Sequence, residues 1–245
     1  MSKRGRFVVV DGLDGVGKGV FLDTFVEEAK KEGKRVFDVN EFWKEYDYYP
    51  SLKEIIGNFD VIVTSEPTFV GIGKVVRNEI IANNGREYTA RATAEAYALD
   101  RRILYETLIL PCLEAGIDVY QSRSFSTSIV FQAQQASDQG EKLTVEDILA
   151  ISGNNFCYNH PMNHLIIPTI RDVEEAVKRS QDRKKQDDCV FENLEFQLKI
   201  KSHYESEELK ELFEQKGVKV TYFDAGVSLE FSREQARDFY QQNLK

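Results

Sequence analysis

The sequence predicts an α/β fold, in which a five-stranded parallel sheet is flanked by helices in a three-layer α/β/α arrangement. Two observations lead to this prediction. Short apolar runs rich in Val and Ile alternate along the chain with longer segments of helical periodicity, which is typical of a parallel sheet covered on both faces. The first of these runs, residues 7–10, leads directly into a glycine-rich loop and then a helical pattern.

The expected strands are short and β-branched, as buried strands of a parallel sheet usually are. They are residues 7–10, 60–64, 117–121, 165–168 and 219–223. Residues 34–39 could form a further short strand.

The expected helices begin and end at recognisable signals. The first spans about residues 19–32 and ends at Gly33, a good C-terminal stop. A long helix is expected over residues 89–114, with Pro111 bending its last turns. Another opens with a capping box over residues 172–175. The last is expected over residues 232–244, with Ser232 as its N-cap.

Length and composition place limits on function. The 245 residues contain no linker or repeat, so we expect a single domain over residues 1–245. The net charge of −9 argues against sequence-independent nucleic-acid binding, which relies on Lys and Arg. Three widely spaced cysteines suit a reducing compartment, and no apolar stretch approaches the ~20 residues of a membrane span. We therefore expect a cytoplasmic protein that binds neither nucleic acid nor membrane.

The segment at about residues 40–59 is expected to be an insertion. Its run at 42–50 is aromatic and acidic, Phe-Trp-Lys-Glu-Tyr-Asp-Tyr-Tyr-Pro. Such a run could line a substrate cleft, and a packed surface insertion fits the sequence equally well.

The glycine-rich loop is the principal functional motif. Its glycines let several backbone N–H groups point into one concavity at the positive end of the next helix, and Lys18 adds a point charge. The expected ATP-binding residues are Gly12, Asp14, Gly15, Val16, Gly17, Lys18 and Gly19. The motif G-x-x-x-x-G-K-[ST] fails after Lys18, because Gly19 stands where a hydroxyl would bind magnesium and Val20 offers no replacement. A chance match of a glycine-rich turn is the alternative.

Three segments follow carboxyl ends of expected strands, where open parallel sheets bind ligands. They are residues 11–18, 65–67 and 122–124, and we expect them to form one site. Arg123 suits an acceptor phosphate, because guanidinium matches phosphate oxygens in bidentate fashion; a structural ion pair is its alternative. Two anchored phosphates with positive charge between them would support phosphoryl transfer.

A second basic group comes later in the chain. Arg179 and Arg183 are four residues apart and share a helix face. With two following lysines they could form a lid at about residues 179–190, although a solvated helix face is as good an interpretation. The expected catalytic residues are Lys18, Arg123, Arg179 and Arg183.

Two further groups of residues are considered as ligand-binding sites. Tyr97 and Arg101, at i and i+4, would present a ring and a hydrogen-bond donor to a nucleobase, unless they are a core tyrosine beside a surface arginine. Cys157, His160 and His164 are only three, without a carboxylate at fixed spacing, so we expect no metal site there.

Five segments, in this order, resemble motifs of the thymidylate kinases, which are P-loop nucleoside monophosphate kinases with a P-loop NTP hydrolase-like fold. They are residues 8–18, 64–68 with 73–77, 98–101, 122–132, and 179–183 followed by Phe191 and Glu192. The chain departs from the family pattern at Gly19, at Ser65 in place of arginine, and at Ser122 in place of aspartate. It therefore resembles a divergent member.

The resemblance implies transfer of the γ-phosphate of ATP to dTMP, with Mg²⁺ accompanying ATP, and a homodimer. It implies that Asp14 contacts the sugar 3′-hydroxyl, Tyr97 stacks on thymine, Arg101 hydrogen-bonds the base, Arg123 holds the acceptor phosphate, and Gln132 borders the nucleotide. The implied substrate-binding residues are Asp14, Glu66, Arg77, Tyr97, Arg101, Arg123 and Gln132. Arg179 and Arg183 would cover ATP, and Gly15 in place of a loop arginine resembles the bacterial-type division of labour.

Two of the departures lie at positions of the magnesium shell. We hypothesise that Asp11 and Glu66 hold the metal through water instead. Two other functions stay open: a kinase for another nucleotide or for a deoxynucleoside, with Glu66 as general base, and a non-catalytic nucleotide-binding protein.

Overall fold

The computed structural model of the chain describes residues 4–181 and 189–245. Its described part contains a six-stranded sheet of order β2-β3-β4-β1-β5-β6, and every neighbouring pair is parallel. The strands are β1 (Phe7–Val10), β2 (Val36–Asp38), β3 (Val61–Ser65), β4 (Asp118–Ser122), β5 (His164–Thr169) and β6 (Lys219–Asp224).

The α/β prediction is confirmed, but the count of five strands is wrong. The sixth strand is β2, which lies within residues 34–39, the segment that the sequence left undecided. Because β2 is a partly exposed edge strand, it lacks the continuous apolar run that marks the central strands.

Helices follow the strands and cover both faces of the sheet. They are α1 (Lys18–Lys31), α2 (Val39–Glu45), α3 (Leu52–Ile55), α4 (Gly71–Val75), α5 (Ala90–Leu104), α6 (Leu110–Glu114), α7 (Phe125–Gln139), α8 (Val145–Ala150), α9 (Ser152–Tyr158), α10 (Val173–Gln181), α11 (Leu194–Tyr204), α12 (Glu207–Glu214) and α13 (Leu229–Asn243). Two π-helical turns, η1 (Val76–Ile80) and η2 (Tyr105–Ile109), follow α4 and α5.

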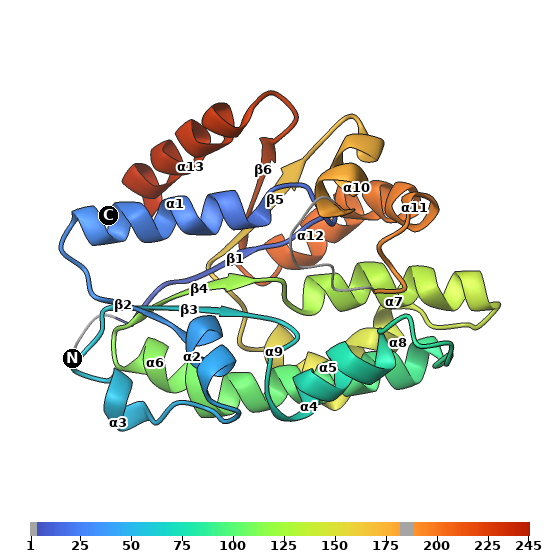
Figure 1. The fold of residues 1–245 in the computed structure, drawn as a ribbon, viewed down its shortest axis with the longest axis horizontal. Helices are drawn as coiled ribbons and strands as arrows, with labels where there is room; N and C mark the ends of the chain where they lie inside the picture. Colours follow the sequence, from blue (N-terminus) through green and yellow to red (C-terminus); the bar gives the residue numbers. More distant parts are fainter. Residues whose placement is uncertain (1–3, 182–188) are drawn as a thin grey trace.

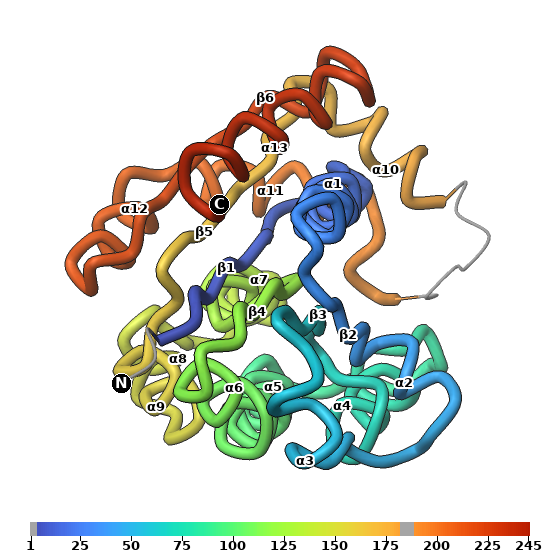
Figure 2. The backbone as a smooth tube through the Cα atoms, turned by 90° about the vertical axis from the view of Figure 1, so that its left-hand side faces the viewer, coloured from blue at the N-terminus to red at the C-terminus, as the bar shows by residue number. Residues whose placement is uncertain are grey.

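The strand β1 contributes to both core layers. Val8 and Val10 pack with residues of α1 and α13, whereas Phe7 and Val9 belong to the core shared with α5, α6 and α7. Figures 1 and 2 show α1 and α13 on one side of the sheet and α5, α6, α7 and α9 on the other. The strand's alternating side chains thus bury both faces, and the predicted three layers are present.

Two helix predictions need correction. The expected helix over 89–114 is α5, then η2, then α6, and Pro111 lies in the first turn of α6, where a missing N–H costs little. The C-terminal helix begins at Leu229, and its N-cap is Ser228, which accepts from Phe231 N at 3.0 Å. Ser232 lies inside that helix. The expected first turn after Asp172 is present, since its carboxylate accepts from Glu175 N at 3.2 Å.

The aromatic run of the expected insertion packs largely on itself. Trp43 is buried and meets Tyr49 edge to face, and Phe42 contacts Tyr46 and Tyr48. None of these residues lines the two pockets described below, which favours the interpretation as a packed surface segment. Among the helices of the described residues, none has the length and apolar character needed to cross a membrane.

The buried His164 makes stability depend on pH. Its side chain is 7% exposed and its ring packs edge-on against Phe239, with centroids 5.3 Å apart. Desolvation, with Lys219 and Arg6 nearby, lowers its pKa to about 4 from 6.5. Between pH 6.5 and about 4, His164 is therefore protonated in the unfolded chain but neutral in the folded protein.

We expect the free energy of unfolding of the wild type, relative to His164→Gln, to fall by on the order of 3 kcal/mol as the pH drops from 7 to 4. Urea unfolding of both proteins at several pH values measures this difference. A difference that stays constant with pH would show that His164 titrates normally in the folded state.

Candidate functional site

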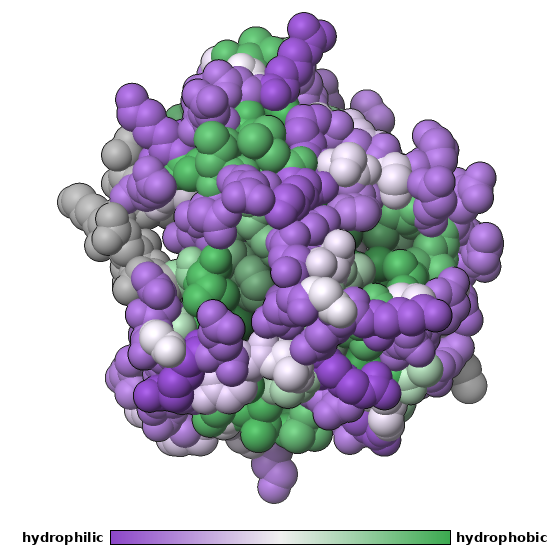
Figure 3. Space-filling view, turned by 90° about the vertical axis from the view of Figure 1, so that its right-hand side faces the viewer, coloured by the Kyte–Doolittle hydropathy of each residue, from purple (hydrophilic) through white to green (hydrophobic). Residues whose placement is uncertain are grey.

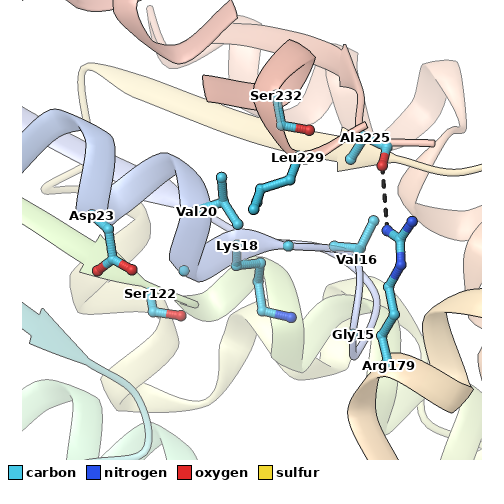
Figure 4. Close-up of a pocket in the computed structure, with 12 residues that line it drawn as sticks. Gly15, Val16, Lys18, Val20, Asp23, Ser122, Arg179, Ala225, Leu229 and Ser232 are labelled. Atoms are coloured by element: carbon cyan, nitrogen blue, oxygen red, sulfur yellow. Dashed lines mark hydrogen bonds between the residues drawn. The ribbon is translucent and has the colours of Figure 1, made fainter. Parts of the chain in front are cut away.

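Two pockets meet at the carboxyl ends of the central strands. The loop pocket, of about 660 Å³, is lined by Gly15, Val16, Gly17, Lys18, Gly19, Val20, Asp23, Ser122, Arg179, Ala225, Leu229 and Ser232 (Figure 4). The strand-end pocket, of about 570 Å³, is lined by residues that include Asp14, Lys18, Ser65, Glu66, Phe69, Arg77, Tyr97, Ser122, Arg123, Phe131, Cys189 and Phe191. Lys18 and Ser122 line both pockets, so the two pockets adjoin.

Backbone hydrogen bonds bring the three strand ends together, as the sequence predicted. Glu66 N donates to Ser122 O at 2.9 Å, and Arg123 N donates to Val10 O at 3.0 Å. Arg123 has a φ of 65°, a conformation that residues other than glycine rarely adopt. The chain therefore turns sharply where it leaves β4, beside the glycine loop.

The glycine loop packs against the helix that carries Arg179. At Gly15, with φ +73°, a Cβ would lie 1.7 Å from Ala176 O of α10. Only glycine permits this contact, so a loop arginine is excluded at that position.

Lys18 projects its charge between the pockets. Its Nζ donates to the carbonyl oxygens of Gly12 and Leu13 at 3.0 and 2.6 Å, and lies 3.7 Å from Asp14 Oδ1. A buried cation held in this way is ready to bind phosphate oxygens of a ligand.

A second cation, Arg123, faces the strand-end pocket. Its Nη2 donates to Asp14, while Nη1 is buried with no hydrogen-bond partner among the described residues and lies 3.7 Å from Asp11 Oδ1. Desolvation lowers the pKa of Arg123, but the negative charges of Asp14 and Asp11 outweigh it, so the pKa is raised. Arg123 therefore lines the pocket as a cation that carboxylates hold in place, and a guanidinium at this position suits an anion that would share it with Asp14.

Aromatic side chains form the wall of the strand-end pocket. Tyr97 of α5 and Phe131 of α7 line it with Phe69. The Arg77 guanidinium lies 3.9 Å from the Phe69 ring centroid and donates to Pro67 O at 2.5 Å. Flat apolar surfaces with a few cations suit a planar base attached to an anion.

Arg101 does not face this pocket, although the sequence paired it with Tyr97. Its side chain is 1% exposed, its Nε donates to Glu66 Oε2 at 2.6 Å, and its Nη2 donates to Ser128 Oγ at 3.2 Å. Burial raises the pKa of Glu66 to about 7, although Arg101 opposes this shift. The direct contact with a base is therefore not found; Arg101 holds Glu66 in the pocket wall.

Asp11 and Gln132 also lie away from both pockets. The Asp11 side chain is fully buried, and its oxygens accept from Thr127 Oγ1, Tyr204 OH and Gly12 N at 2.8–3.0 Å, and from Ser126. Because these oxygens are occupied, the geometry does not support the hypothesis of a metal bound through Asp11. Gln132 is buried, and its amide has no partner among the described residues.

Arg179 lines the loop pocket, and its role in a lid stays a prediction. It extends from α10 to the loop pocket, where it donates to Ala225 O at 3.4 Å (Figure 4). It also donates to Glu175 Oε1 at 2.5 Å on its own helix. The predicted Arg183 lies outside the described residues.

Two residues at the candidate site were not singled out from the sequence. Gln197 of α11 accepts from Asp14 N at 2.9 Å and donates to Asp14 Oδ2 at 3.1 Å; no motif surrounds it, so the sequence held no signal. Asp23 lines the loop pocket. Its position four residues after Gly19 on one helix face was a usable signal.

Comparison with known proteins identifies one family. A family model described as thymidylate kinase matches residues 51–233. The chain is similar to the thymidylate kinase of Exiguobacterium sp., at 24% identity over 241 residues, 98% of this chain and 96% of the relative. It is also similar to that of Enterococcus faecalis, at 27% identity, 93% of this chain and 91% of the relative. A probable thymidylate kinase of Pyrococcus abyssi is 27% identical over 82% of each chain.

The buried ion pair of Arg101 and Glu66 predicts that substitutions of two neighbouring arginines lower stability by unequal amounts. Arg101→Ala leaves Glu66 buried without its cation, so we expect a loss of about 3–5 kcal/mol in the free energy of unfolding. Arg102 pairs with Glu106 near the surface, so Arg102→Ala should cost at most about 1 kcal/mol. Denaturant unfolding of both variants checks this, and equal losses would contradict the structural role of Arg101.

Proposed function

This chain belongs to the thymidylate kinase family, and from that premise we propose that it transfers the γ-phosphate of ATP to dTMP, giving ADP and dTDP. The observation that carries the proposal is the shared lining of the two pockets by Lys18 and Ser122. A phosphate donor in the loop pocket and an acceptor in the strand-end pocket would meet beside these residues, as in-line transfer requires.

ATP occupies the loop pocket in this proposal. The triphosphate lies on the backbone N–H groups of the loop, at the N-terminus of α1, with Lys18 on its outer phosphates. Ala225 and Leu229 offer apolar contacts for adenine, and Arg179, which donates to Ala225 O, adds positive charge beside them.

The acceptor dTMP occupies the strand-end pocket. Its phosphate binds Arg123, a cation of the pocket lining, and the base lies against Tyr97 and its neighbouring rings. Asp14 is close enough to Arg123 to meet the sugar hydroxyl once the acceptor phosphate shares the guanidinium.

The chemical step needs no general base. An oxygen of the dTMP phosphate attacks the γ-phosphorus while the bond to the bridging oxygen breaks, so ADP leaves with that electron pair. Lys18 and Arg123 stabilise charge on the transferring group. Glu66, 3% exposed and bonded to Arg101, orients the wall rather than taking a proton.

Magnesium accompanies ATP in this proposal, and the residues of the loop pocket fit it. Among the described residues, no group of three or more His, Cys, Asp and Glu could hold a metal ion. Such a group is not required, because Mg²⁺ is usually held by phosphates and water with only one or two protein oxygens. When bound, the ion neutralises charge on the β- and γ-phosphates.

The family resemblance supports further proposals about the whole protein. We propose a single domain with an insertion at about residues 40–59 and a lid at about residues 179–190, a homodimer, and a cytoplasmic location. The net charge of −9 supports the absence of a nucleic-acid partner.

The substrate assignment predicts the outcome of an ADP-release assay with ATP, Mg²⁺ and a panel of nucleosides and monophosphates. We expect turnover on dTMP above all others, and a loss of about 100-fold or more in Lys18→Ala, because the outer phosphates lose their cation. Turnover only on nucleosides would support the deoxynucleoside kinase instead. Tight nucleotide binding without turnover would support the non-catalytic protein.

Arg123 predicts a specific loss of acceptor binding. In Arg123→Ala we expect kcat/KM for dTMP to fall about 10- to 100-fold, because a charge-assisted pair with the phosphate is removed. Arg123→Lys should recover only part of this, since lysine cannot bind bidentately. The Kd of ATP, measured by calorimetry, should change little; a parallel loss of ATP affinity would argue against an acceptor role.

A further inference from the structure

Asp23 is an acidic residue of the loop pocket that the proposed mechanism has not used. It lies on α1 and lines the pocket with Gly19 and Ser122. Among the described residues its carboxylate makes no hydrogen bond or salt bridge, whereas Glu28 on the same helix pairs with Lys31 at 2.5 Å. In Figure 4, Asp23 and Ser122 place their oxygens on the same side of Lys18. Asp23 therefore offers a carboxylate that no protein group occupies.

Helix geometry directs this carboxylate toward the loop. Residues four apart lie on one helix face, and side chains lean toward the helix N-terminus. The Asp23 side chain thus leans over Gly19, one turn before it. A Cβ added at Gly19 would meet nothing within 4 Å, so no protein atom fills the space that a hydroxyl-bearing residue would use.

We propose that Asp23 supplies the carboxylate ligand for the Mg²⁺ of bound ATP, with the Ser122 hydroxyl as its companion. This inference rests on the proposed binding of ATP in the loop pocket. Mg²⁺ prefers oxygen ligands and is commonly held by one or two carboxylates with phosphates and waters. A carboxylate one turn along the helix would thereby replace a ligand that the loop lacks at Gly19.

The negative charge of Asp23 should affect ATP binding in opposite directions without and with Mg²⁺. Asp23 faces the pocket proposed to take a triphosphate, and the charges that act on it electrostatically are those of Glu27, Asp38 and, with the opposite sign, Arg233. Without metal, a carboxylate beside the phosphates repels them. When Mg²⁺ lies between the carboxylate and the phosphates, both bind the ion, and the carboxylate then stabilises the bound ATP. Asp23 should therefore oppose metal-free ATP and favour Mg²⁺-ATP.

Calorimetric Kd values for ATP, measured with saturating Mg²⁺ and with EDTA, test the proposal without an acceptor. We expect Asp23→Asn to weaken binding of Mg²⁺-ATP about tenfold, while metal-free ATP binds as tightly as to the wild type or tighter. The matched control is Glu27→Gln, which removes a charge one turn farther along α1 and outside the pocket. Its ratio of the two Kd values should stay within about twofold of the wild type.

A rescue variant separates metal binding from a general charge effect. Gly19→Ser in the Asp23→Asn background should restore part of the Mg²⁺ advantage, because it returns a hydroxyl near the ion. Equal shifts of both Kd values in Asp23→Asn, or equal ratios in the Asp23 and Glu27 variants, would overturn the proposal. Failure of the wild type to bind ATP at all would instead overturn the proposed function.

Discussion

The buried ion pair between Arg101 and Glu66 holds together the elements around the strand-end pocket. Arg101 reaches from α5 to the end of β3, and it also bonds Asn154 of α9 and Ser124 and Ser128 of α7. Gln121 of β4 donates to Glu66 and to the carbonyl of Arg123. Since two buried charges are costly unless each is fully paired, these elements can adopt few alternative arrangements.

Beside this wall, a second carboxylate holds the cations of the site. Asp14 bonds Arg123 and Gln197, and lies within ion-pair range of Lys18. The Asp14 carboxylate thus holds the two cations to which we assign the substrate phosphates. Pairing with phosphate then exchanges one anion for another, so the site need not desolvate a bare cation.

The three departures from the family pattern have different structural settings. Ser65 is tied to α2, since its Oγ donates to Asn40 Oδ1 at 2.6 Å. Gly19 and Ser122 both border the loop pocket, where Asp23 supplies the carboxylate on the adjoining turn of α1. The altered positions are thus not equivalent: one links the site to a neighbouring helix, and two change how a metal can be held.

The sequence by itself determined five of the six strands, the glycine loop, its helix and the meeting of three strand ends, because these depend on local periodicity and on the rules of parallel sheets. It could not determine that Tyr97 faces the pocket while Arg101 faces Glu66. That choice depends on the rotation of α5 against α7 and α9, which many distant contacts set together. Only the tertiary structure decided that Asp11 is enclosed by α7 and α11, and that β2 joins the sheet edge, because burial by remote elements leaves no periodic trace in the segment itself.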